Sequence, residues 1–490
     1  MSAAVALHTR VDIHEVRRDL FVDGAWRAAG SGKRFDVVNP ATEDVLASVA
    51  DASVEDGLAA VDAAATAAAG WAGTAPRARA DILMRAYRLM MDKADWLAEL
   101  ISLENGKALA DARGEVSYAA EFFRWYAEEA VRLIGEMSIA PGGGNRILVQ
   151  YQPVGIAVLV TPWNFPAAMA TRKIGPALAA GCTCVLKPAA ETPLTALAMA
   201  EILAEAGVPG GVVNVVTTST AGPVVSAMLH DPRVRKLSFT GSTKVGQILL
   251  REAADNVVNC SMELGGNAPF IVFDDADIDA AIEGAMIAKM RNGGEACTAA
   301  NRFYIQRGAM EAFGSKLAGR MGAMTVGDGW LPGTACGPLV NEPSRRKVDG
   351  FVKDAVSRGA TVLTGGTPLE RKGYFFAPTV LADVPRDSLL LHDEIFGPVA
   401  ALVPFDSEDE VVELANHTQY GLAAYVYTGN LARGLRVSER IDCGMVALNR
   451  GLVSDPAAPF GGTKQSGLGR EGGHHGLLEF TEAKYIATQW

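Results

Sequence analysis

The sequence has only six cysteines, and this scarcity limits the classes of protein to consider. Six thiols in 490 residues do not make the dense disulfide framework of small secreted domains, so we expect a reduced protein of the cytoplasm. Cys182 and Cys184 alternate within GCTCVLK, with no second cysteine or histidine cluster to complete a metal site. We therefore expect these two thiols to pack in the core, and we predict no metal centre.

Basic residues are also in the minority. The chain has 45 lysines and arginines against 56 aspartates and glutamates, which gives a formal net charge of −11. An acidic protein repels nucleic acids and anionic membranes, so neither is an expected partner. A local basic pocket for a small anion is still compatible with this charge.

No apolar run is long enough, and free enough of helix breakers, to predict a membrane span. The longest uncharged stretch, residues 152–171, contains three prolines and an asparagine, which favours a buried strand, a turn and the start of a helix. The N-terminal residues carry charges throughout and lack the apolar core of a signal peptide, so we expect no export.

The sequence is rich instead in alternating helical and strand-like segments. Residues 54–135 are dominated by helical patterns, in which apolar residues recur at steps of three and four. Strand-like runs, starting with ILVQY at residue 147, then alternate with helical patterns as far as residue 254, and a second such series follows. This order predicts an α/β protein with βαβ units around parallel sheets, in two or more domains.

One cysteine, Cys297, lies in a bare setting. In GGEACTAANR it is flanked mainly by glycine and alanine, so a substrate could reach its sulfur. A thiol in such a place can equally be a small packing residue. Asn164 in TPWNFP can donate to an oxyanion or serve as a polar turn residue, and Glu263 in MELGG can act as a base or as a structural acid. A thiol, an amide donor and a carboxylate together make a plausible set for acyl transfer.

The segment FTGSTKVG, residues 239–246, has the order of a strand, a glycine-containing turn and the start of a helix. Backbone amides near Gly241 and Ser242 could bind a pyrophosphate at such a helix N-terminus. The spacing does not match the GxGxxG dinucleotide fingerprint, so this segment alone is weak evidence.

In combination, these segments resemble the aldehyde dehydrogenase superfamily. The motifs TPWNFP, KPAAETP, FTGSTKVG, MELGGNAP, GEACTAANR, EIFGP and PFGGTKQSGLGREGG occur in that family's order across about residues 20–490. The step of 34 residues from Glu263 to Cys297 is also similar to the family's spacing.

The resemblance implies a Rossmann-like cofactor domain, an α/β catalytic domain and a small β arm for oligomerisation. We assign residues 20–130 and 152–262 to the nicotinamide cofactor-binding domain, residues 263–445 to the catalytic domain, and residues 131–151 with 473–490 to the arm. A homodimer or homotetramer would follow from such an arm.

The resemblance also implies a mechanism that agrees with the residues. Cys297 would attack the aldehyde carbon, while the Asn164 side chain and the Cys297 backbone N–H hold the oxyanion. Hydride would pass to the nicotinamide and leave a thioester, which water activated by Glu263 would hydrolyse. The small residues around the sulfur would leave room for both substrate and nicotinamide.

Other residues are implied in cofactor binding by their places in the family's motifs. Glu394 of EIFGP would hold the nicotinamide ribose, Phe396 would pack near the ring, and Lys187 of KPAAETP would reach the adenosine ribose. In isolation, Glu394 would be an ordinary loop acid and Phe396 an ordinary core residue. The remaining positions along the expected cofactor path are Thr161, Trp163, Gly241, Ser242 and Gly246.

The choice between NAD and NADP depends on one position. Many NAD-preferring members of the family have a glutamate three residues after the lysine, where this chain has Ala190. The missing acid removes repulsion against a 2′-phosphate, so we expect NADP to be tolerated as well as NAD. Glu191, one residue later, could partly restore a preference for NAD.

The substrate class can be inferred from cations near the nucleophile. An aldehyde that bears a carboxylate needs cations and hydroxyl donors at the far end of its pocket. Arg172, Arg291 and Ser454 resemble the Arg, Arg and Ser set of the succinate-semialdehyde dehydrogenases within the superfamily, although each alone would be an ordinary surface arginine or loop serine. Phe165 and Phe460 complete the expected substrate pocket.

We therefore predict an NAD(P)-dependent aldehyde dehydrogenase that oxidises succinate semialdehyde to succinate. A broader dehydrogenase for other acidic or aromatic aldehydes is the first alternative, because one pair of arginines does not define chain length. The alternative of another class is a cysteine hydrolase or acyltransferase without hydride transfer. That enzyme would turn over esters without a nicotinamide cofactor.

Overall fold

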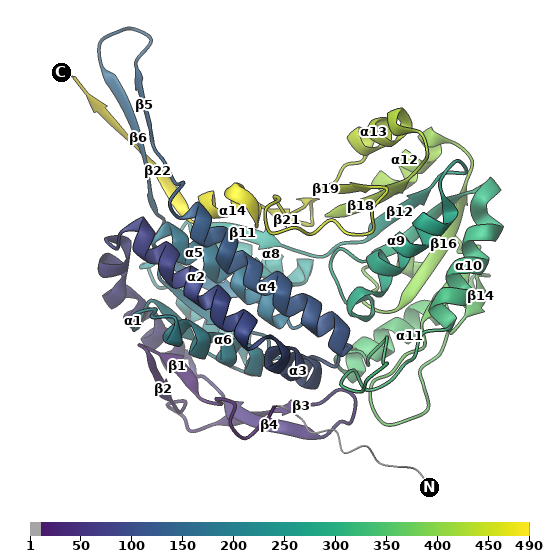
Figure 1. Cartoon of the computed structure of the whole chain (residues 1–490), viewed down its shortest axis with the longest axis horizontal. Helices are drawn as coiled ribbons and strands as arrows, with labels where there is room; N and C mark the ends of the chain where they lie inside the picture. The colour runs from purple at the N-terminus through teal and green to yellow at the C-terminus, as the bar shows by residue number, and fades with distance from the viewer. Residues whose placement is uncertain (1–10, 490) are drawn as a thin grey trace.

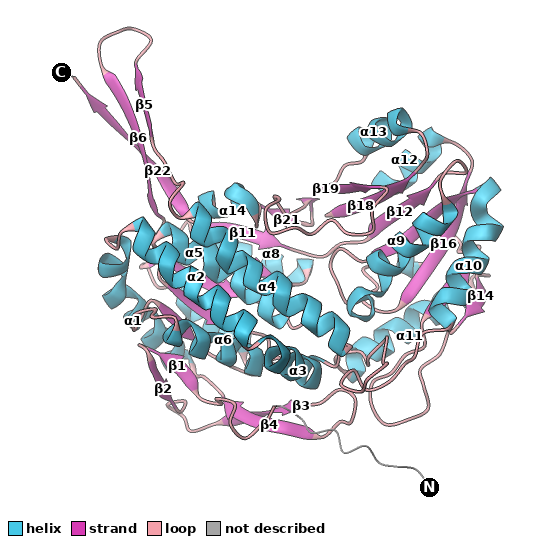
Figure 2. Ribbon diagram, in the orientation of Figure 1, coloured by secondary structure: helices cyan, strands magenta, loops and turns pink. Residues whose placement is uncertain are grey.

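The computed structural model describes residues 11–489, which form two α/β lobes and a projecting arm (Figures 1 and 2). The first lobe is built on an eight-stranded sheet in which the five central strands are parallel and the edge strands antiparallel. In spatial order the strands are β2 (Ala25–Arg27), β1 (Leu20–Val22), β9 (Val213–Val215), β8 (Cys184–Lys187), β7 (Ile156–Val160), β10 (Val234–Thr240), β11 (Asn259–Glu263) and β21 (Gly467–Leu468).

Helices cover both faces of this sheet. One face carries α5 (Pro166–Ala180) and α6 (Pro193–Glu205), backed by α2 (Pro76–Asp92), α3 (Ala94–Asn105) and α4 (Leu109–Glu129). The other face carries α1 (Val54–Ala72), α7 (Ala221–Leu229) and α8 (Thr243–Ala254). Strand β7 explains why two cores form, because Leu159 packs into the first and Val158 into the second. A strand buried on both faces reads as a continuous apolar run, as the sequence does here.

The second lobe repeats this plan on a seven-stranded sheet. Its strands are, in spatial order, β14 (Thr361–Thr364), β15 (Thr379–Ala382), β16 (Val399–Phe405), β13 (Ala300–Gln306), β12 (Ala268–Val272), β18 (Ala423–Tyr427) and β19 (Met445–Leu448). One face packs against α9 (Ile278–Met290) and α10 (Met310–Gly322). The other packs against α11 (Glu342–Ser357), α12 (Glu408–Asn416) and α13 (Leu431–Arg440). The predicted α/β class with parallel sheets is confirmed.

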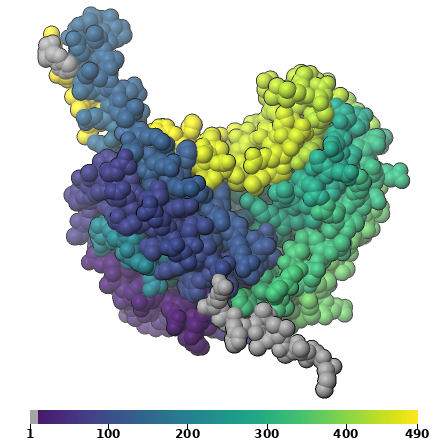
Figure 3. Space-filling model, in the orientation of Figure 1, coloured from purple at the N-terminus to yellow at the C-terminus, as the bar shows by residue number. Residues whose placement is uncertain are grey.

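The arm is a three-stranded antiparallel sheet of β5 (Glu136–Ile139), β6 (Arg146–Pro153) and β22 (Thr481–Thr488). It extends from the body as a narrow projection (Figure 3), and α14 (Gly473–Leu478) lies at its base (Figure 1). The strand-like run ILVQY belongs to this sheet, so it does not begin the parallel series as its place in the sequence had suggested. Two small antiparallel pairs complete the strands, β3 (Arg34–Val38) with β4 (Val45–Ala50) and β17 (Tyr420–Gly421) with β20 (Thr463–Lys464).

The strand order of the first lobe places a crevice between β7 and β10. From β7 the chain proceeds outward through β8 to β9, and then crosses to β10 on the opposite side of β7. The loops after β7 and β10 therefore diverge, and ligands of α/β proteins bind at such a switch point beyond the carboxyl ends of the strands. Strand β11 then leads directly into the second sheet, which brings the two lobes together at this edge. Within residues 11–489, no helix is both long and apolar enough to cross a membrane.

Candidate active site

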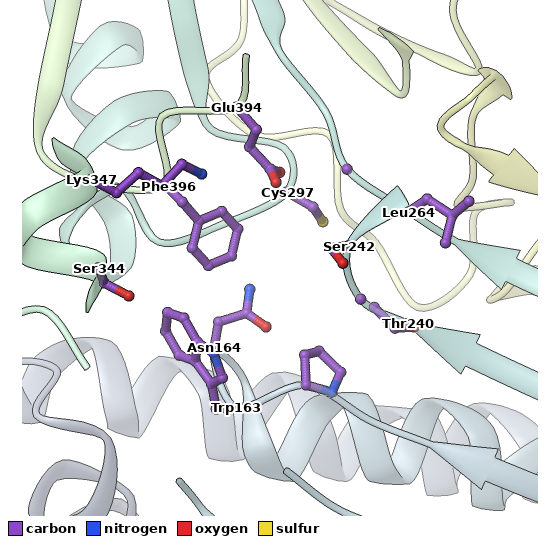
Figure 4. A pocket seen from close by; sticks show the side chains of 13 residues that line it. Trp163, Asn164, Thr240, Ser242, Leu264, Cys297, Ser344, Lys347, Glu394 and Phe396 are labelled. Carbon is purple, nitrogen blue, oxygen red and sulfur yellow. The ribbon is translucent and has the colours of Figure 1, made fainter. Parts of the chain in front are cut away.

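A cavity of about 230 Å³ lies at the switch point, where the loops after β7 and β10 face the second lobe. In Figure 4 the sulfur of Cys297 and the amide of Asn164 point into this space from opposite sides, with the rings of Trp163 and Phe396 beside them. The residues singled out from the sequence that line the cavity are Trp163, Asn164, Gly241, Ser242, Cys297, Glu394 and Phe396. The tertiary structure thus brings the expected nucleophile and oxyanion donor to one site.

The loop before Cys297 needs glycine for its backbone. Asn292, Gly293 and Gly294 have positive φ values of 56°, 60° and 79° in succession. A Cβ atom on Gly294 would lie 2.3 Å from the carbonyl oxygen of Gly397, so a larger residue does not fit there. The small residues of this segment are therefore required in part by the backbone conformation, and not by substrate access alone.

The thiol of Cys297 is only partly accessible, because it is half-buried between the lobes. Burial raises its pKa to about 12, whereas the positive charges of Arg172 and Arg291 act in the opposite direction. The thiolate is the nucleophilic form of cysteine, so reaction requires that this burial effect be offset. The two arginines supply part of that offset from the side of the expected substrate pocket.

Asn164 lies in the turn between β7 and α5, and its side chain is anchored to the nucleophile loop. Its Nδ2 donates to the carbonyl oxygen of Glu295 at 3.1 Å. An amide nitrogen carries two hydrogens, so the second is available for an oxyanion at the sulfur. The main-chain carbonyl oxygen of Asn164 accepts from Lys107 Nζ at 2.6 Å and from Asn292 Nδ2 at 2.9 Å. Both ends of this residue are therefore held in place.

Glu263 is the last residue of β11, and its carboxyl is buried behind the cavity wall rather than on it. Among the described atoms, its Oε2 has no hydrogen-bond partner. Burial and the neighbouring carboxylate of Glu471 raise the pKa of Glu263 well above its usual value, while Arg172 and Lys173 act to lower it. An unsatisfied carboxylate oxygen with a raised pKa is suited to accept a proton from water.

A buried ion cluster lies beside Glu263, and no local sequence pattern predicts it. Glu471 pairs with Arg172 Nε at 2.6 Å and with the ammonium of Lys173. Burial disfavours the charge of Glu471, but Lys173 and Arg172 outweigh it and hold its pKa below the usual value. The adjacent cations were visible in the sequence, whereas Glu471 lies 298 residues beyond Lys173 and had no local signal.

One wall of the cavity combines a carboxyl with aromatic rings. Glu394 accepts from the Gly266 N–H at 3.1 Å, and burial raises its pKa to about 7. Phe396 packs edge-on against Trp163 with ring centroids 5.3 Å apart, and its φ of 57° is a strained conformation for an aromatic residue. Strain of this kind persists where the surroundings impose it. A carboxyl beside flat apolar surfaces fits a ribose hydroxyl next to a nicotinamide ring.

The turn between β10 and α8 contains the residues that the sequence predicts to bind phosphate. Ser242 is the N-cap of α8 and lines the cavity, so the amides of the first helical turn are near it. A Cβ atom on Gly241 would lie 2.4 Å from the ring of Phe239. Gly246 is not on the cavity wall, and a Cβ atom there would lie 2.4 Å from the side chain of Leu264. Its observed role is thus close packing of α8.

Three other residues expected along the cofactor path lie outside the cavity wall. Thr161 is buried, and its N–H donates to the carbonyl of Lys187 at 3.2 Å. Burial lowers the pKa of Lys187 to about 8, and the nearby Glu191 opposes this shift. Glu191 also accepts from Asn341 Nδ2 at 3.5 Å. Ala190 is half-buried and leaves no acid at its own position.

The residues expected to bind a substrate carboxylate gather on the Arg172 side of the sulfur. The guanidinium of Arg172 lies 4.2 Å from the centroid of the Phe460 ring, and that of Arg291 lies 5.1 Å from the centroid of the Phe165 ring. Cation–π contacts of this kind hold each guanidinium against its ring. The two arginines differ in one respect, because Arg172 is 1% exposed and ion-paired while Arg291 is half-buried.

Tyr118 of α4 joins this group, although the sequence analysis did not single it out. Arg172, Arg291 and Ser454 all act to lower the pKa of its hydroxyl, so these three groups lie around it. Burial raises the pKa of Tyr118, so the phenol stays neutral and can donate. A helical pattern marks α4 from the sequence, but no local signal indicates which of its residues faces the site.

Comparison with known proteins gives a consistent picture. The family model described as the aldehyde dehydrogenase family matches residues 26–486. A succinate-semialdehyde dehydrogenase of Paenarthrobacter nicotinovorans is 54% identical over 90% of this chain and 98% of its own length. A glutarate-semialdehyde dehydrogenase of Pseudomonas aeruginosa is 48% identical over 96% of this chain and 97% of its own length.

Solved structures agree with these sequence relatives. The crystal structure of an NADP-dependent enzyme from E. coli superposes with a TM-score of 0.96 at 48% sequence identity, and the match covers 97% of this chain and 98% of the other. At this identity and coverage the similarity concerns the whole chain and not the fold of one lobe alone.

Proposed function

The chain belongs to the aldehyde dehydrogenase family, and on this premise we propose that it oxidises succinate semialdehyde to succinate with NAD or NADP. The observation that carries the proposal is the position of the sulfur. Cys297 lines the cavity with Glu394 and Phe396, and it is also close enough to Arg172 and Arg291 for their positive charges to act on its thiol. An aldehyde carbon held at the sulfur would therefore have a cofactor site on one side and an anion site on the other.

The first half of the reaction uses Cys297 and Asn164. As the sulfur attacks the aldehyde carbon, negative charge develops on the carbonyl oxygen, and the free hydrogen of Asn164 Nδ2 together with the Cys297 N–H stabilises it. Glu394, Phe396, Trp163 and the turn at Ser242 would hold the nicotinamide cofactor. When bound there, the cofactor supplies the acceptor for the hydride.

The second half uses Glu263 to hydrolyse the thioester. Its carboxylate takes a proton from water, and the resulting hydroxide equivalent attacks the acyl carbon. The C–S bond then breaks, the carboxylic acid is released and Cys297 leaves as the thiolate. The raised pKa of Glu263 makes its carboxylate a stronger base than an exposed one. Glu471, kept ionised by Lys173 and Arg172, contributes to that rise through its negative charge. The carboxyl must reach the cavity from its position behind the wall.

The substrate carboxylate would bind to Arg291, Tyr118 and Ser454, with Arg172 contributing charge. A buried anion is costly unless it is paired and hydrogen-bonded, and this group offers a half-buried cation and two hydroxyls. Arg172 is already ion-paired with Glu471, so its removal would disturb the neighbourhood of Glu263 as well. Arg291 is therefore the cleaner residue for a test of substrate class.

We expect wild-type protein to prefer succinate semialdehyde over butanal by more than about tenfold in kcat/KM, which is about 1.4 kcal/mol of differential transition-state binding. Arg291→Ala should lose most of this preference. The substitution removes a partner of the carboxylate of succinate semialdehyde, whereas butanal has no carboxylate and should be affected little. Steady-state rates with both aldehydes at saturating cofactor measure the effect, and Arg291→Lys is the charge-retaining control. Equal turnover of both aldehydes by wild type would contradict the substrate assignment. A higher kcat/KM with glutarate semialdehyde would change the substrate assignment to that aldehyde, which is one methylene longer.

The cofactor choice can be tested at Ala190. Because no acid occupies this position, we propose that the chain accepts NADP as well as NAD. Ala190→Glu should lower kcat/KM for NADP by about tenfold or more, because the new carboxylate repels the 2′-phosphate. The kcat/KM for NAD should change little. Ala190→Gln keeps the size without the charge and is the matched control. An equal loss with both variants would indicate a steric effect and would count against the electrostatic explanation.

We propose that the arm mediates homo-oligomerisation. Its sheet projects from the body and exposes Met137, Ile139, Tyr485 and Ile486 to solvent, and Ile134 is exposed just before it. Apolar side chains gathered on such a projection favour burial against another copy of the chain. The choice between dimer and tetramer, the assigned domain limits and the cytoplasmic location stay predictions from the sequence.

A further inference from the structure

A buried lysine stands behind the oxyanion donor. Lys107 occupies the turn between α3 and α4, and its side chain is 1% exposed. Its ammonium donates to Glu115 Oε2 and to the main-chain carbonyl oxygen of Asn164, both at 2.6 Å, and lies 4.3 Å from the centroid of the Phe165 ring. The ammonium of Lys107 thus contacts the backbone of Asn164, the proposed oxyanion donor, although the two residues are 57 positions apart in the chain.

The partner of this lysine holds the helix that follows Asn164. The second carboxylate oxygen of Glu115 accepts from the backbone N–H groups of Ala167 and Ala168 at 2.8 and 3.2 Å. These amides belong to the first turn of α5, where the helix dipole favours a negative charge. Lys107 and Glu115 therefore restrain Asn164 from both sides, through its carbonyl and through the helix that begins two residues later.

The same turn also holds the residue before Asn164. Asn105 Nδ2 donates to the carbonyl oxygen of Trp163 at 3.1 Å, so two consecutive carbonyls are held by one turn. The turn itself is tied down, because Ser102 Oγ donates to the carbonyl of Lys107 at 2.7 Å. Support of this kind matters for catalysis, since a displacement of about 1 Å at a reacting centre can reduce a rate by about 10²-fold.

Stability alone does not require a charged pair at this place. The cost of removing two charges from water offsets most of their attraction, and apolar residues of similar size are often as stabilising. What apolar residues cannot do is hydrogen-bond the backbone on both sides of Asn164. We propose that Lys107 is a positioning residue, which acts through the Asn164 backbone to keep the amide nitrogen where the oxyanion forms. Lys107 transfers no proton in this account and contacts no substrate.

Two reactions of Cys297 need no cofactor, and together they distinguish a positioning role of Lys107 from a general loss of structure. In acylation by p-nitrophenyl acetate, the sulfur bonds to the carbonyl carbon through a tetrahedral oxyanion, which collapses as p-nitrophenolate leaves. In alkylation by iodoacetamide, the sulfur bonds to a methylene carbon as iodide leaves, and no oxyanion forms. The ratio of the two rate constants, acylation to alkylation, therefore reports on the oxyanion site and cancels changes in thiol ionisation or access.

In Lys107→Met we expect the ratio of acylation to alkylation to fall about tenfold or more. One oxyanion donor accelerates acylation by about 10²- to 10³-fold, and a misplaced donor loses part of that acceleration. The single variant leaves Glu115 charged and unpaired, so its Tm should also fall. The double variant Lys107→Met/Glu115→Gln removes both charges, and should regain stability while the ratio stays low. Lys236→Met is the matched control, a buried lysine of β10 that hydrogen-bonds Asn259 and Ser261 away from the cavity.

The control should lower Tm and leave the ratio unchanged. A ratio within about twofold of wild type in the folded double variant would overturn the proposal and leave Lys107 a purely structural role. An equal fall in Lys236→Met would overturn it as well, because the ratio would then follow stability. Neither reagent carries a carboxylate or needs NAD(P), so the outcome does not depend on the identity of the natural aldehyde.

Discussion

Replacement of Cys297 by alanine should abolish aldehyde oxidation, with kcat reduced by about 10⁴-fold or more. In the proposed mechanism the sulfur forms the bond that makes the carbonyl carbon tetrahedral, and loss of a nucleophile that acts together with its oxyanion site has cost about 10⁶-fold in a well-studied protease. Initial rates of NADPH or NADH formation measure the loss. Cofactor affinity, measured by calorimetry, should stay within about threefold, because the cofactor-side wall is formed by other residues, among them Glu394, Phe396 and Ser242.

A second half-buried thiol gives the matched control for this result. Cys443 lies in the loop before β19, and its Sγ donates to the Met445 carbonyl. Cys443→Ala should retain the activity of the wild type. If Cys297→Ala kept more than about 1% of wild-type kcat, the covalent mechanism would be wrong. If it lost cofactor affinity as well, the variant would report a collapsed site and not the absence of a nucleophile.

Replacement of Glu263 by glutamine should separate the two halves of the reaction. Without a base the thioester persists, so one equivalent of reduced cofactor per site should form rapidly and turnover should then fall by about 10²- to 10⁴-fold. Rapid mixing records the burst, and mass spectrometry should find the acyl group on Cys297. Asn164→Ala provides the contrast, because loss of the oxyanion donor slows the burst itself. A Glu263→Gln variant with neither burst nor adduct would show that Glu263 acts before hydride transfer.

The same base gives the wild-type pH profile a definite sign. In the proposed mechanism Glu263 acts as the carboxylate, and burial together with Glu471 raises its pKa above the usual value. The rate of thioester hydrolysis should therefore increase with pH and level off above the raised pKa, and it should fall about tenfold per unit below it. Glu263→Gln should lack this dependence, and single-turnover hydrolysis of the acyl-enzyme at a series of pH values measures it.

The sequence by itself determined the family and predicted the catalytic residues. Cys297, Asn164 and Glu263 each lie in a short motif where a strand or a helix ends in a turn, and such turns are encoded by local residues. The alternation of apolar strands with helical patterns predicted the parallel sheets, which the structure confirms. The likeness of these motifs to aldehyde dehydrogenases is confirmed by the family match over residues 26–486.

Only the tertiary structure decided how these groups are supported. Glu471, two residues before α14, meets Lys173 of α5 across 298 residues, and Lys107, two residues before α4, reaches Asn164 across 57. Both contacts form because α14 and α4 pack against α5. No periodicity or motif specifies a contact between buried charges so far apart in the chain. Local sequence determines which backbone turns form and which side chains they present. Packing decides which charges lie beside those side chains, and hence their pKa values, their orientation and the strength of the base.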